Sequence, residues 1–188
     1  MTARDRLLDL FVQRSFRLGD FTLASGRKSD FYIDCRTTTM HAEGQVLLGE
    51  VGCDYLADAG WQPDLIGGLT MGADPIAYAV AGESFRRDKP INAFSVRKQA
   101  KQHGTGRQIE GCFEPNANIV VVEDVITTGG SALQACEAIK AAHGSIVGIL
   151  AAVDREEGGS EAIAEAGFKM IPMFGIGELR KRAAELAG

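Results

Sequence analysis

One stretch of the sequence decides the predicted fold: Ile119-Val120-Val121-Val122-Glu123-Asp124-Val125-Ile126-Thr127-Thr128-Gly129-Gly130-Ser131. It begins with a run of β-branched apolar residues, which is typical of a strand buried on both faces of a parallel sheet. The composition then changes from apolar to polar. Two carboxylates come first, and after two further apolar residues follow two hydroxyls, two glycines and a third hydroxyl. Residues 132–139 favour a helix by composition. The stretch therefore predicts a buried strand, a glycine-rich turn and a helix start.

The turn at the end of this stretch predicts an anion site. Amides in the first turn of a helix have no partner within the helix, and the helix dipole favours negative charge there. Gly129 and Gly130 allow the backbone to curl closely around a phosphate. The hydroxyls of Thr127, Thr128 and Ser131 add donors. The turn is not a Walker loop, because no Gly-Lys-Ser/Thr follows, and it is not a Gly-x-Gly-x-x-Gly dinucleotide turn.

The adjacent acids Glu123 and Asp124 need a separate explanation. Carboxylates repel a phosphate, so they must hold a group that gains from them, and the vicinal hydroxyls of a sugar are such a group. A phosphate site beside a sugar site predicts a ribose 5-phosphate pocket over residues 123–131. The alternative is an ordinary strand–helix turn with a helix cap and a solvated acidic pair. The pocket is favoured because residues close together in the sequence supply the carboxylates, hydroxyls, glycines and helix start that such a pocket requires.

Residues 120–131 read Val-Val-Val-Glu-Asp-Val-Ile-Thr-Thr-Gly-Gly-Ser. This pattern resembles the phosphoribosyl pyrophosphate (PRPP) motif of the type I phosphoribosyltransferases. The resemblance implies an α/β fold, a parallel twisted sheet flanked by helices with a small N-terminal hood, in a single domain over residues 1–188. It also implies that PRPP is bound by these residues: Glu123, Asp124, Val125, Ile126, Thr127, Thr128, Gly129, Gly130 and Ser131.

Composition restricts the class of protein. The chain has 188 residues, 45% of them hydrophobic, which suffices for one domain with a sizeable core. The formal net charge of −5 argues against a nucleic-acid-binding surface. The four cysteines lie far apart without metal-ligand spacing, as expected for free thiols in a reducing cytoplasm. Since neither a signal peptide nor a membrane-spanning run is recognisable, we expect a cytoplasmic protein that binds neither nucleic acid nor membrane.

Two β-prone segments near the N-terminus, residues 21–23 and 31–33, flank a polar turn that contains Gly26. This pattern predicts a hairpin. The hairpin precedes the alternating strand–helix pattern, so we expect it to form a hood over about residues 15–37, outside the main sheet. On these residues alone, Phe31 and Tyr32 fit a ligand-binding pair and the small core of a hood equally well.

Residues 21–34 read Phe-Thr-Leu-Ala-Ser-Gly-Arg-Lys-Ser-Asp-Phe-Tyr-Ile-Asp. They resemble the N-terminal signature of the orotate branch of the phosphoribosyltransferases. The resemblance implies that Phe31 and Tyr32 flank a flat pyrimidine and that Lys28 contributes to the same site. Many members of the branch carry a lysine where this chain has Ala24.

Hydrophobic periodicity predicts the remaining elements. The expected helices cover residues 4–12, 42–59, a segment from near Pro75, 161–166 and an exposed tail at 178–186; the expected strands cover 65–69, 91–96, 146–153 and 168–174. In the helix over 42–59, one apolar face is expected from Val46, Leu47, Val51, Tyr55 and Leu56.

A second glycine-containing turn, residues 70–74, follows the predicted strand at 65–69. Ligands collect at this edge of open parallel sheets, although a plain strand–helix connection has the same sequence pattern. The family resemblance implies that this turn contacts the pyrophosphate. Many relatives have a lysine in this turn, where the chain has Gly72.

A basic segment follows the strand predicted at 91–96. Between Arg97 and Ile109 the sequence holds four Lys or Arg residues, one His, two Gly and no acid. A solvated face is the common explanation of a charge run, and no apolar periodicity could bury this one. Its sign is opposite to the net charge, however, and a polyanionic substrate is already indicated. These facts favour a basic lid over a pyrophosphate.

The segment reads Arg-Lys-x-x-Lys-x-His-Gly from Arg97 and resembles the catalytic loop of the orotate branch. The resemblance implies a homodimer in which this loop enters the neighbouring site. It assigns PRPP contacts to Arg97, Lys98, Lys101 and His103. It assigns the catalytic roles to Lys101, His103 and Asp124, the first two as candidates to donate a proton to pyrophosphate.

Arg155 stands at the end of the strand predicted over 146–153. An arginine there can form a two-pronged pair with a carboxylate, and a local ion pair with Glu156 or Glu157 is the alternative. The resemblance assigns the orotate carboxylate to Arg155 and places Thr127 beside orotate.

Together the resemblances imply transfer of the phosphoribosyl group of PRPP to orotate, giving orotidine 5′-monophosphate and diphosphate in pyrimidine biosynthesis. Mg²⁺ is expected, bound mainly through the diphosphate, without a predicted protein ligand. A purine phosphoribosyltransferase would share residues 123–131, but it gives no reason for the hairpin aromatics, the basic loop and Arg155 together. A regulator with this fold should carry an added nucleic-acid-binding element.

Overall fold

The computed structural model describes the whole chain except residues 23–25, 27 and 100–107. Its helices are α1 (Ala3–Arg14), α2 (Arg36–Thr39), α3 (Ala42–Asp58), α4 (Ala73–Arg86), α5 (Gly130–Ala141), α6 (Gly159–Glu165) and α7 (Ile176–Ala187). Its strands are β1 (Phe16–Thr22), β2 (Lys28–Ile33), β3 (Leu65–Leu69), β4 (Asn92–Val96), β5 (Ile109–Gly111), β6 (Asn118–Ile126), β7 (Ser145–Asp154) and β8 (Met170–Gly175).

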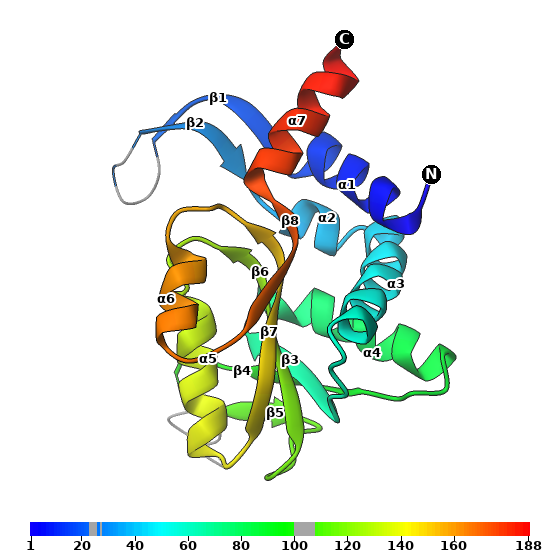
Figure 1. Cartoon of the computed structure of the whole chain (residues 1–188), viewed down its shortest axis with the longest axis vertical. Coiled ribbons are helices and arrows are strands. Elements are labelled where there is room, and N and C mark those ends of the chain that lie inside the picture. The colour runs from blue at the N-terminus through cyan, green and yellow to red at the C-terminus, as the bar shows by residue number, and fades with distance from the viewer. Residues whose placement is uncertain (23–25, 27, 100–107) are drawn as a thin grey trace.

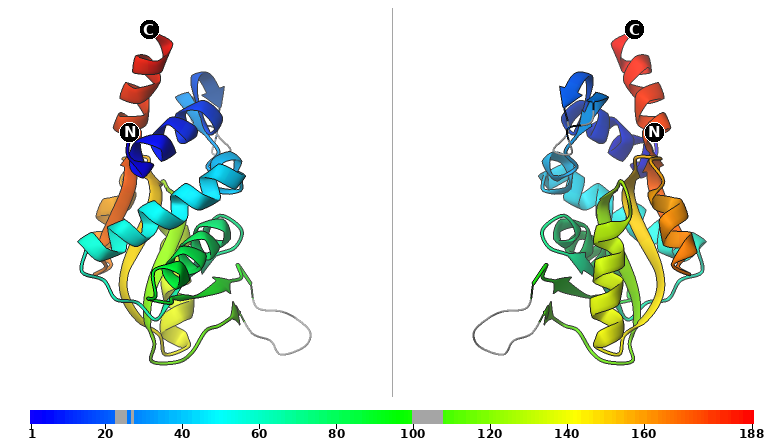
Figure 2. Two further views of the ribbon diagram at one scale, coloured as in Figure 1. Left: turned by 90° about the vertical axis from the view of Figure 1, so that its right-hand side faces the viewer. Right: turned by 90° about the vertical axis from the view of Figure 1, so that its left-hand side faces the viewer.

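The main sheet has the strand order β5-β4-β3-β6-β7-β8. Neighbours from β4 to β8 run parallel, and β5 pairs antiparallel with β4. Helices α3 and α4 lie on one side of the sheet and α5 lies on the other (Figures 1 and 2). The predicted α/β class, a mostly parallel sheet flanked by helices, is confirmed.

The central strand β6 shows why the apolar run folds as it does. Successive side chains of a strand point to opposite faces. Val120 and Val122 accordingly enter the core beneath α3 and α4, while Ile119 and Val121 enter the core beneath α5. All four are fully buried. A strand that serves two cores must be apolar at every position, so continuous hydrophobicity here marks a central strand.

β6 is longer than the apolar run suggested. The sequence placed the acidic pair at the end of the strand, and β6 continues beyond it through Ile126. The extension exists because β7 supplies partners, with Glu123 opposite Ala151 and Ile126 opposite Asp154. Both acids therefore stand on a paired, rigid strand.

The N-terminal hairpin is present as a separate two-stranded sheet of β1 and β2. Its register runs from Phe16 opposite Ile33 to Thr22 opposite Lys28, so the strands extend beyond the segments predicted for them. The hairpin lies beside α7, above the main sheet in Figure 1. This arrangement matches the expected hood.

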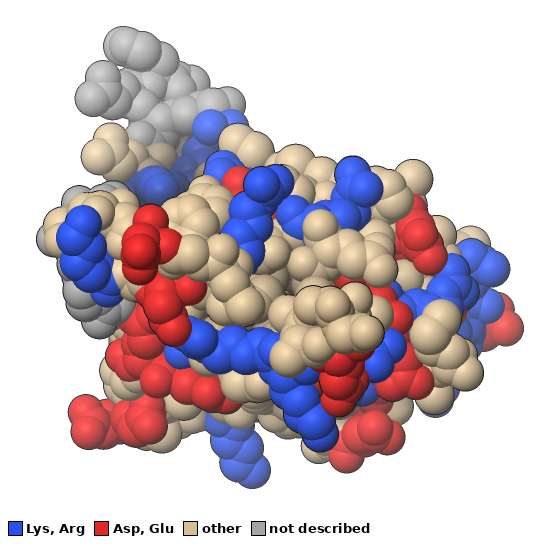
Figure 3. All heavy atoms as spheres, turned by 90° about the horizontal axis from the view of Figure 1, so that it is seen from above, with Lys and Arg blue, Asp and Glu red and all other residues tan. Residues whose placement is uncertain are grey.

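The tail helix α7 is docked, and the expectation of an exposed tail was wrong. Ile176 and Leu179 are buried. Arg182 pairs with Asp9 of α1, and Arg180 pairs with Asp30 of β2. Lys and Arg side chains alternate with Asp and Glu over the face that carries the hood and α7 (Figure 3).

One smaller expectation fails. Val46 was predicted on the apolar face of α3, but it is exposed. Helix α4 starts at Ala73, near Pro75 as predicted. In the part of the chain that the structure describes, no helix is long and apolar enough to cross a bilayer.

Candidate active site

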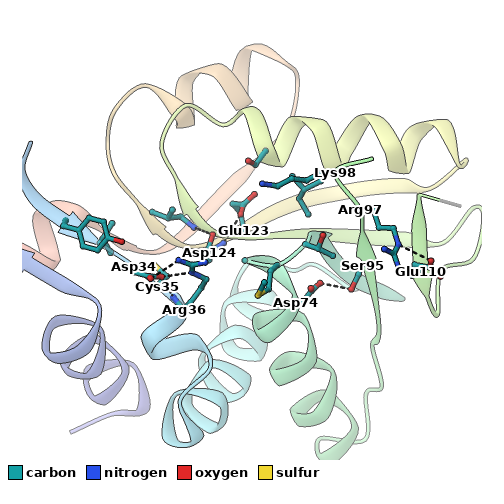
Figure 4. Close-up of a pocket in the computed structure, with 18 residues that line it drawn as sticks. Asp34, Cys35, Arg36, Asp74, Ser95, Arg97, Lys98, Glu110, Glu123 and Asp124 are labelled. Carbon is teal, nitrogen blue, oxygen red and sulfur yellow. Dashed lines mark hydrogen bonds and ion pairs between the residues drawn. The ribbon is translucent and has the colours of Figure 1, made fainter. Parts of the chain in front are cut away.

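A cavity of about 860 Å³ opens at the carboxyl ends of β3, β4 and β6. Its size suits a small molecule, and ligands of open parallel sheets bind at this edge. Figure 4 shows side chains that converge on it from the hood, the β3–α4 turn, β4 and β6. The residues predicted from the sequence that line it are Tyr32, Arg97, Lys98, Glu123, Asp124, Val125 and Ser131.

Glu123 is buried in the wall of this cavity and is 6% exposed. Burial, together with the negative charge of Asp124, raises the pKa of Glu123 well above its usual range. One carboxylate oxygen, Oε1, accepts a hydrogen bond of 3.3 Å from the Asp124 amide. The other, Oε2, is buried and has no hydrogen-bond partner among the described residues. A buried acceptor left in this state costs free energy, so a donor from a ligand would stabilise it.

Asp124 lies against the turn between β3 and α4. Its Oδ1 accepts a hydrogen bond of 2.9 Å from the Val125 amide. A Cβ atom added at Gly72 would lie 2.5 Å from this same Oδ1, which is closer than atoms can approach. The Asp124 carboxylate thus fills the space that a side chain at position 72 would need.

The glycine-rich turn leads directly into α5. Gly129 is the N-cap of α5 and adopts a left-handed conformation with φ of +79°, which favours glycine. No side chain caps this helix start. The first amides of α5 are therefore available to an anion, as the sequence predicted. Ser131 lines the cavity, and Thr127 and Thr128 belong to the same turn.

The basic segment reaches the cavity at its first two residues. Arg97 forms an ion pair of 3.2 Å with Glu110 of β5, and Lys98 also lines the cavity. The backbone carbonyl of Lys98 accepts a hydrogen bond from Gln134 of α5. The predicted catalytic residues Lys101 and His103 lie outside the described residues.

The two hood aromatics do not face the same cavity. Tyr32, 42% exposed, lines the main cavity and packs on Phe21 with ring centroids 5.6 Å apart. Phe31 is buried and packs on Phe16. Adjacent strand residues point to opposite sides, so the two rings do not flank one space in this structure.

Phe31 and Lys28 instead line a second cavity of about 730 Å³, together with Glu157. The Lys28 ammonium donates a hydrogen bond of 2.8 Å to Thr22. Of the residues predicted to bind orotate, Phe31 and Lys28 therefore gather at one cavity and Tyr32 at the other. Thr127 stays in the glycine-rich turn.

Arg155 is 7% exposed and forms an ion pair with Glu157, in which its Nε donates to Oε1 over 2.9 Å. Its guanidinium also lies over the ring of Phe31, 4.5 Å from the centroid. The local ion pair that the sequence left as an alternative is therefore present. The ion pair places Arg155 beside the second cavity, through Phe31 and Glu157.

Several cavity residues were missed by sequence reasoning. They are Asp34, Cys35 and Arg36, which follow β2 within the hood, and Ser95, which belongs to β4. Asp34 and Arg36 form an ion pair of 2.9 Å. Burial raises the pKa of the Cys35 thiol well above its usual value. Only Ser95 gave a signal, as a polar residue near the carboxyl end of a strand.

The cavity walls suit a divalent cation that arrives with a ligand. Carboxylates of Asp74, Glu123 and Asp124 line the cavity, and oxygen ligands are those that Mg²⁺ prefers. Among the described residues, however, no group of three or more Asp, Glu, His or Cys residues is arranged to hold a metal. The unpartnered Glu123 oxygen fits a cation or its bound water without a preformed protein cage.

Comparisons with known proteins agree with this geometry. The phosphoribosyl transferase domain family matches residues 53–177. The chain is 46% identical over 184 residues to an orotate phosphoribosyltransferase from Rhodopseudomonas palustris (strain BisB5), covering 96% of this chain and 97% of the relative. It is 42% identical over 182 residues to one from Aquifex aeolicus (strain VF5), covering 95% and 98%.

Solved structures give the same result. The orotate phosphoribosyltransferase of Mycobacterium tuberculosis H37Rv in complex with PRPP superposes with a TM-score of 0.80 at 36% identity, covering 95% of this chain and 99% of that one. The same enzyme in complex with Fe(III) dicitrate gives a TM-score of 0.84 at 40% identity, with 95% and 99% coverage.

Proposed function

This chain belongs to the phosphoribosyltransferase family as an orotate phosphoribosyltransferase, and from that premise we propose how its residues carry out the reaction. The reaction transfers the phosphoribosyl group of PRPP to orotate and gives orotidine 5′-monophosphate and diphosphate, a step of pyrimidine biosynthesis. The observation that carries the proposed site is the buried, unpartnered oxygen of Glu123 beside Asp124, next to the glycine-rich turn.

In the proposed complex, the sugar phosphate of PRPP spans β6 and the start of α5. Glu123 and Asp124 accept hydrogen bonds from the two ribose hydroxyls. The amides and hydroxyls of residues 127–131 bind the 5-phosphate, because the uncapped helix start offers free donors and a favourable dipole.

The chemistry separates charge. The bond between the anomeric carbon and the diphosphate oxygen breaks, and its electrons leave with diphosphate. Orotate N1 releases its proton to solvent and bonds to that carbon. Positive charge develops on the sugar near Asp124, and negative charge develops on diphosphate. We propose that Arg97 and Lys98 stabilise diphosphate, and that Lys101 and His103 donate a proton to it.

Mg²⁺ is proposed to enter with PRPP, bound mainly through the diphosphate oxygens. When bound, it neutralises part of the diphosphate charge. Carboxylates of Glu123 and Asp124 would face it, directly or through its waters, since both line the cavity.

The decisive test of the reaction is a spectrophotometric assay. Purified protein with PRPP and Mg²⁺ should consume orotate, followed by its ultraviolet absorbance, and leave adenine, hypoxanthine and uracil unchanged. Use of a purine base in preference to orotate would contradict the assignment.

We propose that orotate is recognised by Lys28, Phe31, Tyr32, Thr127 and Arg155. In the structure the Arg155 guanidinium is paired with the carboxylate of Glu157. On binding, the orotate carboxylate would displace Glu157 and form a two-pronged pair with Arg155. Because Phe31 and Tyr32 line different cavities, binding would also require a change in the hood.

Arg155→Ala should raise the KM for orotate by about tenfold or more, since a charge-assisted hydrogen bond is lost. Steady-state kinetics with orotate as the varied substrate measure this. Glu157→Gln is the matched control, because it removes the competing carboxylate and keeps the arginine, so KM should not rise. A lowered unfolding temperature with normal kinetics in Arg155→Ala would show a purely structural role.

Gly72→Ala should lower kcat/KM for PRPP by about ten- to a hundredfold, because the new methyl group displaces the Asp124 carboxylate. The unfolding temperature should change little, since the displaced group is the end of a side chain. Gly82→Ala in α4 is the control, where an added Cβ meets nothing within 4 Å. Equal kinetics for the two variants would show that the position of Asp124 is not critical.

We propose that the protein is a homodimer in which the basic segment enters the neighbouring site. Tyr78 and Phe85 are 54% and 74% exposed and lie seven residues apart, so they share one side of α4. Met71, which is 58% exposed, lies in the turn that precedes this helix. Large exposed apolar side chains in a row are typical of an interface.

A cytoplasmic location is proposed because Cys35, Cys53 and Cys136 are buried free thiols.

A further inference from the structure

A chain of hydrogen bonds connects the exposed side of α4 to the cavity. The Ser95 hydroxyl donates to Asp74 Oδ1 over 2.7 Å, and the Tyr78 hydroxyl lies 3.1 Å from the Ser95 oxygen. Since Ser95 has only one hydroxyl hydrogen and gives it to Asp74, Tyr78 must donate to Ser95. Tyr78 therefore donates to Ser95, and Ser95 donates to Asp74, which holds the Asp74 carboxylate in the cavity wall. Figure 4 shows the bond between Ser95 and Asp74.

The charges around the cavity do not suit a bare diphosphate. Its described lining holds five carboxylates and three basic side chains. Two of the basic groups are engaged by acids of the same lining, in the pairs Arg36–Asp34 and Arg97–Glu110. The raised pKa of Glu123 keeps that group from contributing a full negative charge, which leaves Asp74 and Asp124 with Lys98 as the other basic side chain. A cation that accompanies a polyanion would offset the repulsion by these two carboxylates.

A second observation points to a ligand in the same place. Glu123 lines the cavity and is only 6% exposed. Its Oε2 lacks a hydrogen-bond partner among the described residues. Figure 4 shows its carboxylate directed into the cavity that Asp74 also lines. An oxygen that is withdrawn from water and directed into this space would be stabilised by a donor or a cation beyond the described residues.

We propose that Asp74, held by Ser95 and Tyr78, is a further positioning residue that orients the hydrated divalent cation accompanying the diphosphate of PRPP. The inference rests on the proposed function and extends it to Asp74, the second residue of α4. The turn before α4 leaves position 72 without a side chain, and the first turn of α4 offers a carboxylate. We therefore infer that this region attracts diphosphate through the cation.

The test is the binding of diphosphate by isothermal calorimetry at a series of Mg²⁺ concentrations, without turnover. Asp74→Asn keeps the shape of the side chain and removes its charge. It should weaken binding of magnesium diphosphate by about tenfold at limiting Mg²⁺, and excess Mg²⁺ should recover part of the loss. Ser95→Ala and Tyr78→Phe should each give a smaller loss in the same direction, because they release Asp74 without removing it.

Asp58→Asn is the matched control, since Asp58 is an exposed acid of α3 outside the cavity lining. Unchanged or tighter binding of magnesium diphosphate by Asp74→Asn would overturn the proposal, because the carboxylate would then be neutral or repulsive. If Asp74→Asn did not fold, the binding of magnesium diphosphate by Ser95→Ala and Tyr78→Phe would test the proposal instead. Binding as tight as that of the wild-type protein in both variants would overturn the proposal. Failure of the wild-type protein in the orotate assay would instead refute the proposed function, whatever the variants bind.

Discussion

Asp124→Asn is expected to lower kcat by about two to three orders of magnitude without loss of the fold. In the proposed complex the carboxylate lies where positive charge develops on the ribose, so its negative charge would stabilise that transition state more than the ground state. Asparagine has the same shape, and its carbonyl oxygen can still accept from the Val125 amide. The measurement is kcat at saturating PRPP and orotate, with the unfolding temperature as the check on folding.

Glu123→Gln is the control for this experiment. It alters the neighbouring carboxylate, which we assign to the ribose hydroxyls, so it should act mainly on the KM for PRPP. The charge of Asp124 also helps to raise the pKa of Glu123, so Asp124→Asn should lower that pKa and let Glu123 ionise at lower pH. A kcat of Asp124→Asn within twofold of the wild-type value would remove Asp124 from the chemistry.

Mixing two inactive variants, Lys101→Ala and Asp124→Asn, is expected to restore about a quarter of the wild-type activity. In a shared site, the lysine comes from one subunit and the aspartate from the other. A mixed dimer of these variants then contains one site with both native residues and one site with neither. Random exchange makes about half of the dimers mixed, and each of these has one working site of two.

The assay requires proof that subunits have exchanged. Two affinity tags of different mass allow mixed dimers to be purified and counted before activity is measured. The double variant Lys101→Ala/Asp124→Asn mixed with the single variant Asp124→Asn is the negative control, because no arrangement then assembles a native site. Absence of recovery in purified mixed dimers would show that each subunit forms its site alone.

Local chemistry explains why much of the fold and the phosphate turn could be predicted. β6 is apolar at each of residues 119–122 because it serves two cores, and this need is visible in the sequence as an uninterrupted run. Gly129 adopts a left-handed conformation that few residues other than glycine favour, so a glycine in the sequence indicates the turn.

Other features were missed because they depend on partners far away in the chain. The acids of residues 123 and 124 belong to β6 only because β7 extends beside them. Helix α7 is docked through Leu179 and through pairs such as Arg180 with Asp30, 150 residues away. The sequence grouped Phe31 with Tyr32 as neighbours, but strand geometry sends adjacent side chains to different cavities.

The sequence by itself predicted most of the strands and helices, because hydrophobic periodicity is a local property, but it did not predict the short elements α2 and β5. The type of substrate was indicated by several motifs that together resemble one family. Only the tertiary structure decided what meets across the cavity. Gly72 lies against Asp124, Asp74 is held by Ser95, and Arg155 is engaged by Glu157 beneath the hood. The physical reason is that packing fixes the distances and burial on which these contacts depend, and a linear pattern carries neither.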